Sequence, residues 1–365
     1  MTRRNRDSPV PCPDETCALG NLFLGIAVGS CKAWAKMRIA SFRFLAVLAA
    51  FSSGWGVLLA KETSSPAGKA ASRAIPLIEK SALVYVEKRD CFSCHHQALA
   101  MMALGRSRDV GLKVSQDSIA TQAEFSLDYF GGRSKLLLQG KGVPGGPYNA
   151  GYALTSLSAA GEPADEVTQA LVRYLLKSQK KDGSWKIINH RPPIEDSHFA
   201  ATALSYRGLQ AYGELEERKG SLEKALQWLK ETPPGSTEDH AFKLLGLHWG
   251  GVPKAKETGK ASRALLDLQR EDHGWAQLPD MTSDAYATSL ALFALKESGA
   301  PQPVPEAISL GEKWLLDHQL KDGSWLVKTR SKPIQKPLDS EFPHGKHQFI
   351  SMSATCWAVM ALAPR

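Results

Sequence analysis

The chain has 365 residues, a formal net charge of +8, and 43% hydrophobic and 22% charged residues, which is typical of a globular protein. Residues 1–60 hold 7 of the 45 basic and 3 of the 37 acidic residues, so the rest carries a net charge of only +4. No arginine-rich stripe interleaved with aromatic residues is present, which argues against a nucleic-acid partner. Three of the six cysteines also lie in residues 1–60, and the other three, Cys91, Cys94 and Cys356, are too few for a disulfide framework.

Residues 1–60 have the pattern of a secretory signal. A short basic stretch, Met37–Arg43, precedes an apolar run over residues 44–60, after which cleavage is expected. Translation would then begin at Met37. Two other interpretations stay open: the run is kept as a membrane anchor, or Cys31 marks a lipoprotein cleavage site. We therefore expect an exported chain, periplasmic or secreted, that meets a membrane only through this segment if it stays uncleaved.

After an expected linker at residues 61–72, the hydrophobic pattern predicts six pairs of helices. The first helix of each pair is amphipathic, with charges on one side, whereas the second is rich in Ala, Ser, Thr and Leu. Small residues nearly all round a helix suit packing on several sides, so we expect the second helices to form an inner ring and the first helices an outer ring. The predicted pairs are Ala74–Lys88 with Gln97–Arg106, Ser115–Phe130 with Asn149–Ala160, Ala164–Ser178 with Ser197–Tyr212, Leu222–Lys230 with Asp239–His248, Gly259–Leu268 with Asp284–Ser298, and Glu306–His318 with Phe349–Leu362.

One seven-residue sequence motif recurs between paired helices, at residues 179–185, 269–275 and 319–325. It reads Gln-x-x-Asp-Gly-Ser-Trp twice and Gln-Arg-Glu-Asp-His-Gly-Trp once. Gly-Ser-Trp allows a tight turn after the outer helix, the indole can pack under its neighbour, and the glutamine can bond to free backbone groups at an adjacent helix end. We interpret the tryptophans as structural, the alternative being that they stack on a ligand.

The ends of three inner helices share a spacing. Gly111, Gly213 and Gly299 each follow such a helix, as left-handed C-caps do. Counting back fifteen residues from each of them leads to His96, His198 and Asp284. These three residues are therefore predicted to occupy equivalent positions near the starts of inner helices.

The recurring motif resembles the QW repeat of squalene–hopene cyclases, oxidosqualene cyclases and protein prenyltransferase β subunits. Together with the paired helices, the resemblance covers about residues 70–363. The resemblance implies an all-α fold, an α/α toroid of six helical hairpins at residues 73–365, with a largely apolar central cavity that opens at one end of the inner helices. The catalytic motifs of those families are missing. The chain has no adjacent Asp-Asp pair, as in the Asp-x-Asp-Asp acid of the cyclases, and no Asp-x-Cys, as in the zinc motif of the transferases. The predicted fold therefore does not by itself imply the activity of those families.

The segment Cys91-Phe92-Ser93-Cys94-His95-His96 stands before the first inner helix, where other hairpins carry the repeat. Cys-x-x-Cys-His is the attachment motif for c-type haem. The two thiols can bond both vinyl groups and His95 can ligate the iron, and attachment outside the cytoplasm agrees with export. The candidates for the sixth ligand are Met101, Met102 and His198.

Three alternatives to haem c stay open for this segment. Cys91 and Cys94 with His95 or His96 are also a candidate zinc site, with a fourth ligand from another hairpin. The thiols can instead form a disulfide or a redox pair. The segment can also bind no cofactor, with the cysteines acting as small buried residues.

A looser group of polar residues is expected at one rim of the inner ring. Asp196, His198 and Asp284 are its candidate catalytic residues, as general acid and base. Acidic residues at helix starts are explained equally well as helix caps, without a catalytic role. Alternate inner helices lie about 15–18 Å apart, too far for His96, His198 and Asp284 to share one metal ion. The full group is Tyr148, Asn149, Glu195, Asp196, His198, Glu238, Asp239, His240, Asp284, Tyr286, His344 and His347.

Two classes of function follow from these features. The leading hypothesis is an exported toroid that acts as a binding or redox module, with haem c or another metal at Cys91, Cys94 and His95, and that meets a redox partner. The alternative is a divergent terpenoid cyclase or prenyltransferase-like enzyme on an apolar small molecule, with Asp196, His198 or Asp284 as the acid.

Overall fold

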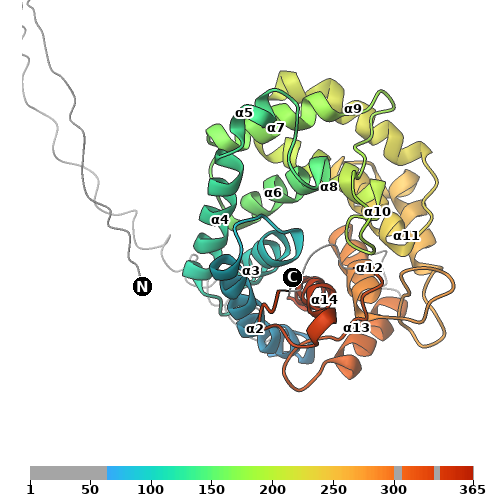
Figure 1. The fold of residues 1–365 in the computed structure, drawn as a ribbon. Helices are drawn as coiled ribbons and strands as arrows, with labels where there is room; N and C mark the ends of the chain where they lie inside the picture. Colours follow the sequence, from blue (N-terminus) through green and yellow to red (C-terminus); the bar gives the residue numbers. More distant parts are fainter. Residues whose placement is uncertain (1–63, 300–305, 333–337, 365) are drawn as a thin grey trace, which may run out of the picture. The chain divides into compact units, whose positions relative to one another are not determined.

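The computed structural model describes residues 64–299, 306–332 and 338–364, which contain helices and no strand. Six of these helices form a closed inner ring in which each packs on the next and the last packs on the first (Figure 1). In ring order they are α3 (Leu99–Asp109), α6 (Gly146–Ala160), α8 (His198–Tyr212), α10 (Thr237–Trp249), α12 (Ala285–Glu297) and α14 (Gln348–Leu362).

The outer ring surrounds these helices in Figure 1. It consists of α2 (Pro66–Lys88), α4 (Gln116–Gly131), α5 (Ser134–Leu138), α7 (Glu166–Ser178), α9 (Leu215–Glu231), α11 (Gly259–Leu266) and α13 (Glu306–His318). Short π-helical or 3₁₀ turns stand before three helices: η1 (Cys94–Ala98), η2 (Lys254–Thr258) and η3 (Gly345–His347). The prediction of an all-α toroid of six hairpins is confirmed.

Two predictions about helix ends need correction. The first outer helix begins at Pro66, because Ser65 caps it by accepting a hydrogen bond from the Gly68 N–H at 3.1 Å and proline suits the first turn. Residues 66–72 therefore belong to α2 and not to a linker. Gly111 and Gly299 have left-handed φ angles of 79° and 70°, whereas Gly213 has a φ of −77° and leaves α8 in an extended conformation.

The inner helices all start at the same end of the ring. At that end the Thr237 hydroxyl, in the first turn of α10, donates to the carbonyl of Ala276, which precedes α12, at 2.6 Å. At the other end Arg108 of α3 donates to the carbonyl of Ala160, the last residue of α6, at 2.8 Å. The parallel order follows from the hairpins, because each outer helix returns the chain to the same starting end.

The three repeat tryptophans have the structural role that the sequence predicts. Trp185, Trp275 and Trp325 have no exposed surface, and the indole N–H of each donates at 2.8 Å to the backbone carbonyl ten residues earlier. The backbone N–H of each donates to a threonine hydroxyl of the paired inner helix at 2.9–3.3 Å. Each tryptophan therefore joins its outer helix to its inner helix.

The repeat glutamines join neighbouring hairpins. The Gln179 side chain donates at 2.8 Å to the carbonyl of Gly183 in its own turn and to that of Ser221 in the next outer helix. Gln319 makes the same pair of bonds, to Gly323 at 2.9 Å and to Ala70 of α2 at 2.8 Å. The last repeat therefore closes the ring between the C-terminal and N-terminal hairpins.

Gly323 lies in close contact with α2 at this closure, and its replacement gives a first prediction. Its φ is 90°, and a Cβ added there would lie 2.6 Å from the Arg73 carbonyl oxygen of α2. We expect Gly323→Ala to lower the free energy of unfolding by about 2 kcal/mol or more, measured by urea denaturation. Gly220→Ala is the matched control, because that glycine lies inside α9 with open space around it and alanine favours a helix. Equal effects of the two substitutions would contradict the prediction.

None of the described helices is long and apolar enough to cross a membrane. The predicted signal segment, residues 1–60, lies outside the described residues.

Candidate functional site

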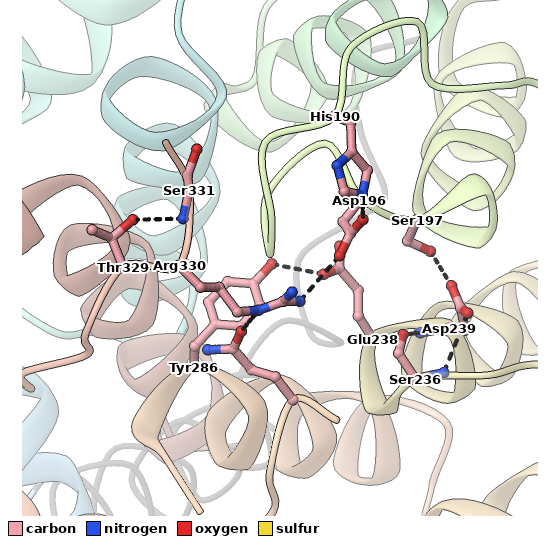
Figure 2. Close-up of polar contacts among 11 residues, drawn as sticks. His190, Asp196, Ser197, Ser236, Glu238, Asp239, Tyr286, Thr329, Arg330 and Ser331 are labelled. Atoms are coloured by element: carbon pink, nitrogen blue, oxygen red, sulfur yellow. Dashed lines mark hydrogen bonds and ion pairs between the residues drawn. The ribbon is translucent and has the colours of Figure 1, made fainter. Parts of the chain in front are cut away.

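The candidate site lies at the end of the ring where the inner helices begin. Helix N-termini carry partial positive charge, and six of them meet at this end. The loop before α8 and the segment before α14 reach across it, so that residues far apart in the sequence meet there (Figure 2). This end is the rim at which the sequence predicts the polar residues.

Glu238, in the first turn of α10, is the buried acid of this site. Its side chain is 6% exposed, and Tyr286 of α12 donates a hydrogen bond from its hydroxyl to Oε2 at 3.3 Å (Figure 2). The other oxygen, Oε1, is buried and has no hydrogen-bond partner among the described residues. Burial, with the charges of Asp239 and Asp196, holds the pKa of Glu238 well above its usual range. The site therefore favours a protonated carboxylic acid.

Aromatic rings form the interior next to this acid. Tyr148 and Tyr152 of α6 are buried with their ring centres 5.0 Å apart, and burial followed by nearby groups raises the pKa of both hydroxyls. Trp357 of α14 is buried among the rings of Phe242 and Phe293, at 6.0 and 5.3 Å. The ring faces are electron-rich and can stabilise a positive charge.

An ionic cover separates Glu238 from solvent. Asp196, just before α8, pairs through Oδ2 with the Arg330 guanidinium at 3.0 Å and through Oδ1 with His190 at 2.5 Å. Arg330 also donates to the side-chain oxygen of Gln277 at 2.7 Å, and Figure 2 shows its guanidinium reaching toward Asp196. The pocket that Asp196, Arg330 and Glu238 line has a water-accessible volume of about 10 Å³, enough for about one water molecule.

The structure separates the three predicted catalytic residues. Asp196 lines the pocket with Glu238 but is held by two basic partners. Asp284 is the N-cap of α12 and accepts from the backbone N–H groups of Tyr286 and Ala287 at 2.9 and 3.0 Å, while burial raises its pKa to about 6. His198 begins α8, where its Nδ1 accepts from a backbone N–H at 3.3 Å and burial lowers its pKa. His198 and Asp284 are not among the residues that line the pocket beside Glu238.

Sequence reasoning placed Glu238 at the rim but did not single it out. Capping explains acids at helix starts, and Asp239 does form a capping box with Ser236, with the Asp239 N–H donating to the Ser236 hydroxyl at 3.1 Å. Because Asp239 makes this cap, Glu238 is left to face the interior. The signal available in the sequence was the adjacency of two acids: if Asp239 caps the helix, its neighbour Glu238 has no capping role.

The Cys-x-x-Cys-His-His segment forms the turn that leads into α3. Ser93 caps the π-helical turn η1 by accepting from the His96 N–H at 3.0 Å. The His95 ring stacks on Phe349 at 4.7 Å, and the buried His96 ring stacks on Tyr85 at 4.8 Å. Burial, followed by the charge of Arg191, lowers the pKa of His95 to about 3, and burial holds that of His96 well below its usual range. Both imidazoles are therefore neutral at pH 7.

The thiols of this segment differ in their surroundings. Cys91 is partly exposed with its sulfur 3.5 Å from the Tyr85 hydroxyl, whereas Cys94 is 7% exposed and burial raises its pKa. Both are free thiols, as is the fully buried Cys356. Because a c-type haem needs both thiols at its edge, the buried Cys94 fits this group poorly in the folded segment. Met101 is fully buried in α3.

Within the described residues, no group of three or more His, Cys, Asp or Glu side chains is placed to hold a metal ion. The predicted zinc set, Cys91 and Cys94 with His95 or His96, is therefore not assembled as a metal site there.

The ring of paired helices and its QW-like repeats define an α/α toroid of the terpene-cyclase type. The type II terpene cyclase MstE from Scytonema is 18% identical, with a TM-score of 0.50, over 80% of this chain and 98% of that one. A variant of MstE in complex with its substrate geranylgeranyl dihydroxybenzoate is 16% identical, with a TM-score of 0.51, over 81% and 99%. At these identities the likeness shows the fold alone. No protein-family model and no curated protein matches the chain.

Proposed function

We propose that this chain is an acid-catalysed enzyme that acts on an apolar, prenyl-type substrate and that Glu238 is the proton donor. The observation that carries the proposal is the Glu238 carboxyl group, buried beside the Tyr286 hydroxyl and an interior of aromatic rings, with a raised pKa and one oxygen that has no partner among the described residues. A protonated acid in a water-poor, aromatic interior is suited to transfer a proton to a carbon–carbon double bond.

The chemistry balances without a redox partner. The proton of Glu238 adds to one end of a double bond, whose π electrons form the new C–H bond and leave a carbocation. Internal double bonds then attack the cation in turn, the last cation loses a proton to water, and protonation of the Glu238 carboxylate from water completes an isomerisation with no net change in protons. Tyr286 keeps Glu238 in place through its hydrogen bond, and the rings of Tyr148 and Trp357 stabilise positive charge.

The proposal requires the cover over Glu238 to move. A pocket with about 10 Å³ of water-accessible volume does not hold a prenyl chain. The Asp196–Arg330 pair joins two loops that are 134 residues apart in the sequence, and its separation would let both loops leave the rim. Loop motion that admits a substrate and then excludes water is a common step in enzymes.

The test of the proposal is an assay for an isomer of unchanged mass. The purified chain is incubated with geranylgeranyl dihydroxybenzoate and with linear prenyl alcohols of several lengths, and the products are separated by chromatography and weighed by mass spectrometry. We expect a cyclic isomer from at least one substrate and none with heat-denatured protein. Recovery of the linear compounds alone from the whole panel would contradict the proposal.

The redox-module hypothesis has its own test. If Cys91 and Cys94 carry haem c, the full chain expressed with residues 1–60 in a host that matures c-type cytochromes will show a Soret band that survives acid–acetone extraction. The band is expected to disappear in Cys91→Ala/Cys94→Ala and to persist in the control Cys356→Ala. A colourless wild-type protein from a host that loads a reference cytochrome would exclude haem c.

A further inference from the structure

The cover over the candidate acid consists of two irregular segments, residues 186–197 before α8 and residues 326–332 before α14. The Asp196–Arg330 ion pair joins the two segments at 3.0 Å (Figure 2). Each segment also has its own tie to the inner helix that follows it. Both of these ties are made by a histidine.

The two histidine ties have the same form. The Ile187 N–H, at the start of the first segment, donates to Nδ1 of His198 at 3.3 Å. The Thr329 N–H, in the second segment, donates to Nδ1 of His347 at 3.0 Å. His198 begins α8 and His347 directly precedes α14. The same kind of bond therefore holds each half of the cover at the start of an inner helix.

Both bonds require an unprotonated Nδ1. A backbone N–H can only donate, so the imidazole nitrogen is the acceptor, and a neutral imidazole accepts at one of its two nitrogens. Protonation of the ring places a hydrogen on Nδ1 and sets it against the backbone N–H. His198 is exposed and His347 is partly exposed, so protons from the solvent reach both rings. Acidification therefore breaks both ties.

The charges around His198 are mixed, and together with burial they favour the neutral ring. Burial, followed by the charge of Lys186, lowers the pKa of His198, whereas Asp239 and Asp182 act in the opposite direction. Lys186 precedes Ile187 in the cover, and Asp239 lies in the first turn of α10. The closed cover therefore holds His198 in its neutral form at pH 7.

The charges around His347 are basic. Burial, followed by the charges of Lys346 and Lys328, lowers the pKa of His347. His344 lies near enough for the charge of His347 to lower its pKa as well. Lys328 directly precedes Thr329 in the cover. A proton on His347 therefore removes the acceptor of the Thr329 N–H and repels the same segment.

We propose that the cover is a pH-sensitive lid, which His198 and His347 hold shut when they are neutral and release when they are protonated. Regulation of catalysis by this lid rests on the function proposed for Glu238, whereas the opening itself does not. The closed cover lowers the pKa of both rings below the ordinary value of about 6.5, so the closed form binds fewer protons than the open form. The lid is therefore most stable above about pH 6.5, and each histidine weakens it by up to about tenfold per pH unit below that value.

Other ionisable groups act on the cover in the same pH range. The His190 side chain pairs with Asp196 and is 73% exposed, so its protonation opposes opening, but an exposed pair of this kind contributes little. The pKa of Asp284 is raised to about 6, with Arg330 among the charges that act on it. Loss of the Asp284 charge on acidification is therefore the effect that a control has to separate from the histidines.

The test is hydrogen–deuterium exchange of the full chain at pH 5.5 and 7.5, read by mass spectrometry of peptides and corrected for the intrinsic exchange rate at each pH. We expect the protection of peptides that contain Ile187 or Thr329 to fall about tenfold or more on acidification. A peptide from α14 should stay protected, which distinguishes opening of the lid from unfolding of the chain.

Two histidine variants isolate the cause. His198→Asn/His347→Asn keeps a side-chain oxygen that can accept the backbone N–H and does not titrate, so its protection should not depend on pH. His347→Asn alone should remove the pH dependence for the Thr329 peptide and keep it for the Ile187 peptide. His248→Asn, in the last turn of α10, is the matched control and should behave as the wild type.

Three results would overturn the lid: equal protection of the wild type at both pH values, an equal fall in the wild type and the double variant, or a fall that Asp284→Asn abolishes. The exchange measurement uses no substrate, so it is independent of the assay for a cyclic isomer. A static cover on an active enzyme contradicts the lid alone, and an opening cover without any product contradicts only the function proposed for Glu238.

Discussion

Glu238→Gln is expected to lower the rate of product formation by about 10²–10⁴-fold, the usual contribution of a general acid. Glutamine keeps the size of the side chain and can still accept from the Tyr286 hydroxyl, but it has no acidic proton to transfer. The measurement is the initial rate with whichever prenyl substrate the wild type converts. Glu223→Gln, an exposed change of the same type on α9, should retain the wild-type rate.

The same variant should also change how stability depends on pH. The folded-state pKa of Glu238 is raised, so the folded chain holds a proton that the unfolded chain releases above about pH 4. The free energy of unfolding of the wild type should therefore fall as pH rises from about 4 toward the folded-state pKa, by up to about 1.4 kcal/mol per pH unit from this group. Thermal denaturation of Glu238→Gln should lack that contribution. Parallel pH curves for the two proteins would show that Glu238 is not buried in its neutral form.

Trp325→Ala is expected to lower the free energy of unfolding by about 3–5 kcal/mol. The indole is fully buried, donates to the Leu315 carbonyl at 2.8 Å, and belongs to the repeat whose Gln319 joins α2. Its removal leaves a cavity and an unpaired carbonyl where the ring closes. Urea denaturation measures the loss.

The comparison for Trp325 is Trp249, which ends α10 and is only partly buried. Trp249→Ala should cost clearly less, because its surroundings can relax into solvent. Trp325→Phe should lie between the wild type and Trp325→Ala, since it keeps most of the apolar surface and loses the hydrogen bond. A loss no greater for Trp325→Ala than for Trp249→Ala would mean that the closing repeat does not stabilise the ring.

The ring itself was predictable from the sequence because the interactions that define it repeat. Amphipathic and small-residue helices alternate, and the recurring Gln and Trp make the same two kinds of bond each time they occur. Helix termini were predicted less well: α2 begins at Pro66, and Gly213, which follows α8, is not a left-handed cap. The start of α2 is marked locally by the Ser65 cap and Pro66, whereas Gly213 differs in conformation from Gly111 and Gly299 at the same position of the pattern.

Our proposal of Glu238 as the acid depends on the tertiary structure alone. Asp196, Glu238 and Asp284 all stand near the starts of inner helices, and local sequence makes each a capping candidate. Arg330, 134 residues from Asp196, pairs with that carboxylate, whereas among the described residues the hydrogen-bond partner of the Glu238 carboxyl group is the Tyr286 hydroxyl. Short-range periodicity and turn chemistry, which the sequence contains, determined the architecture of paired helices. Burial and long-range pairing, which set the charge of a carboxyl group, arise only when the ring closes.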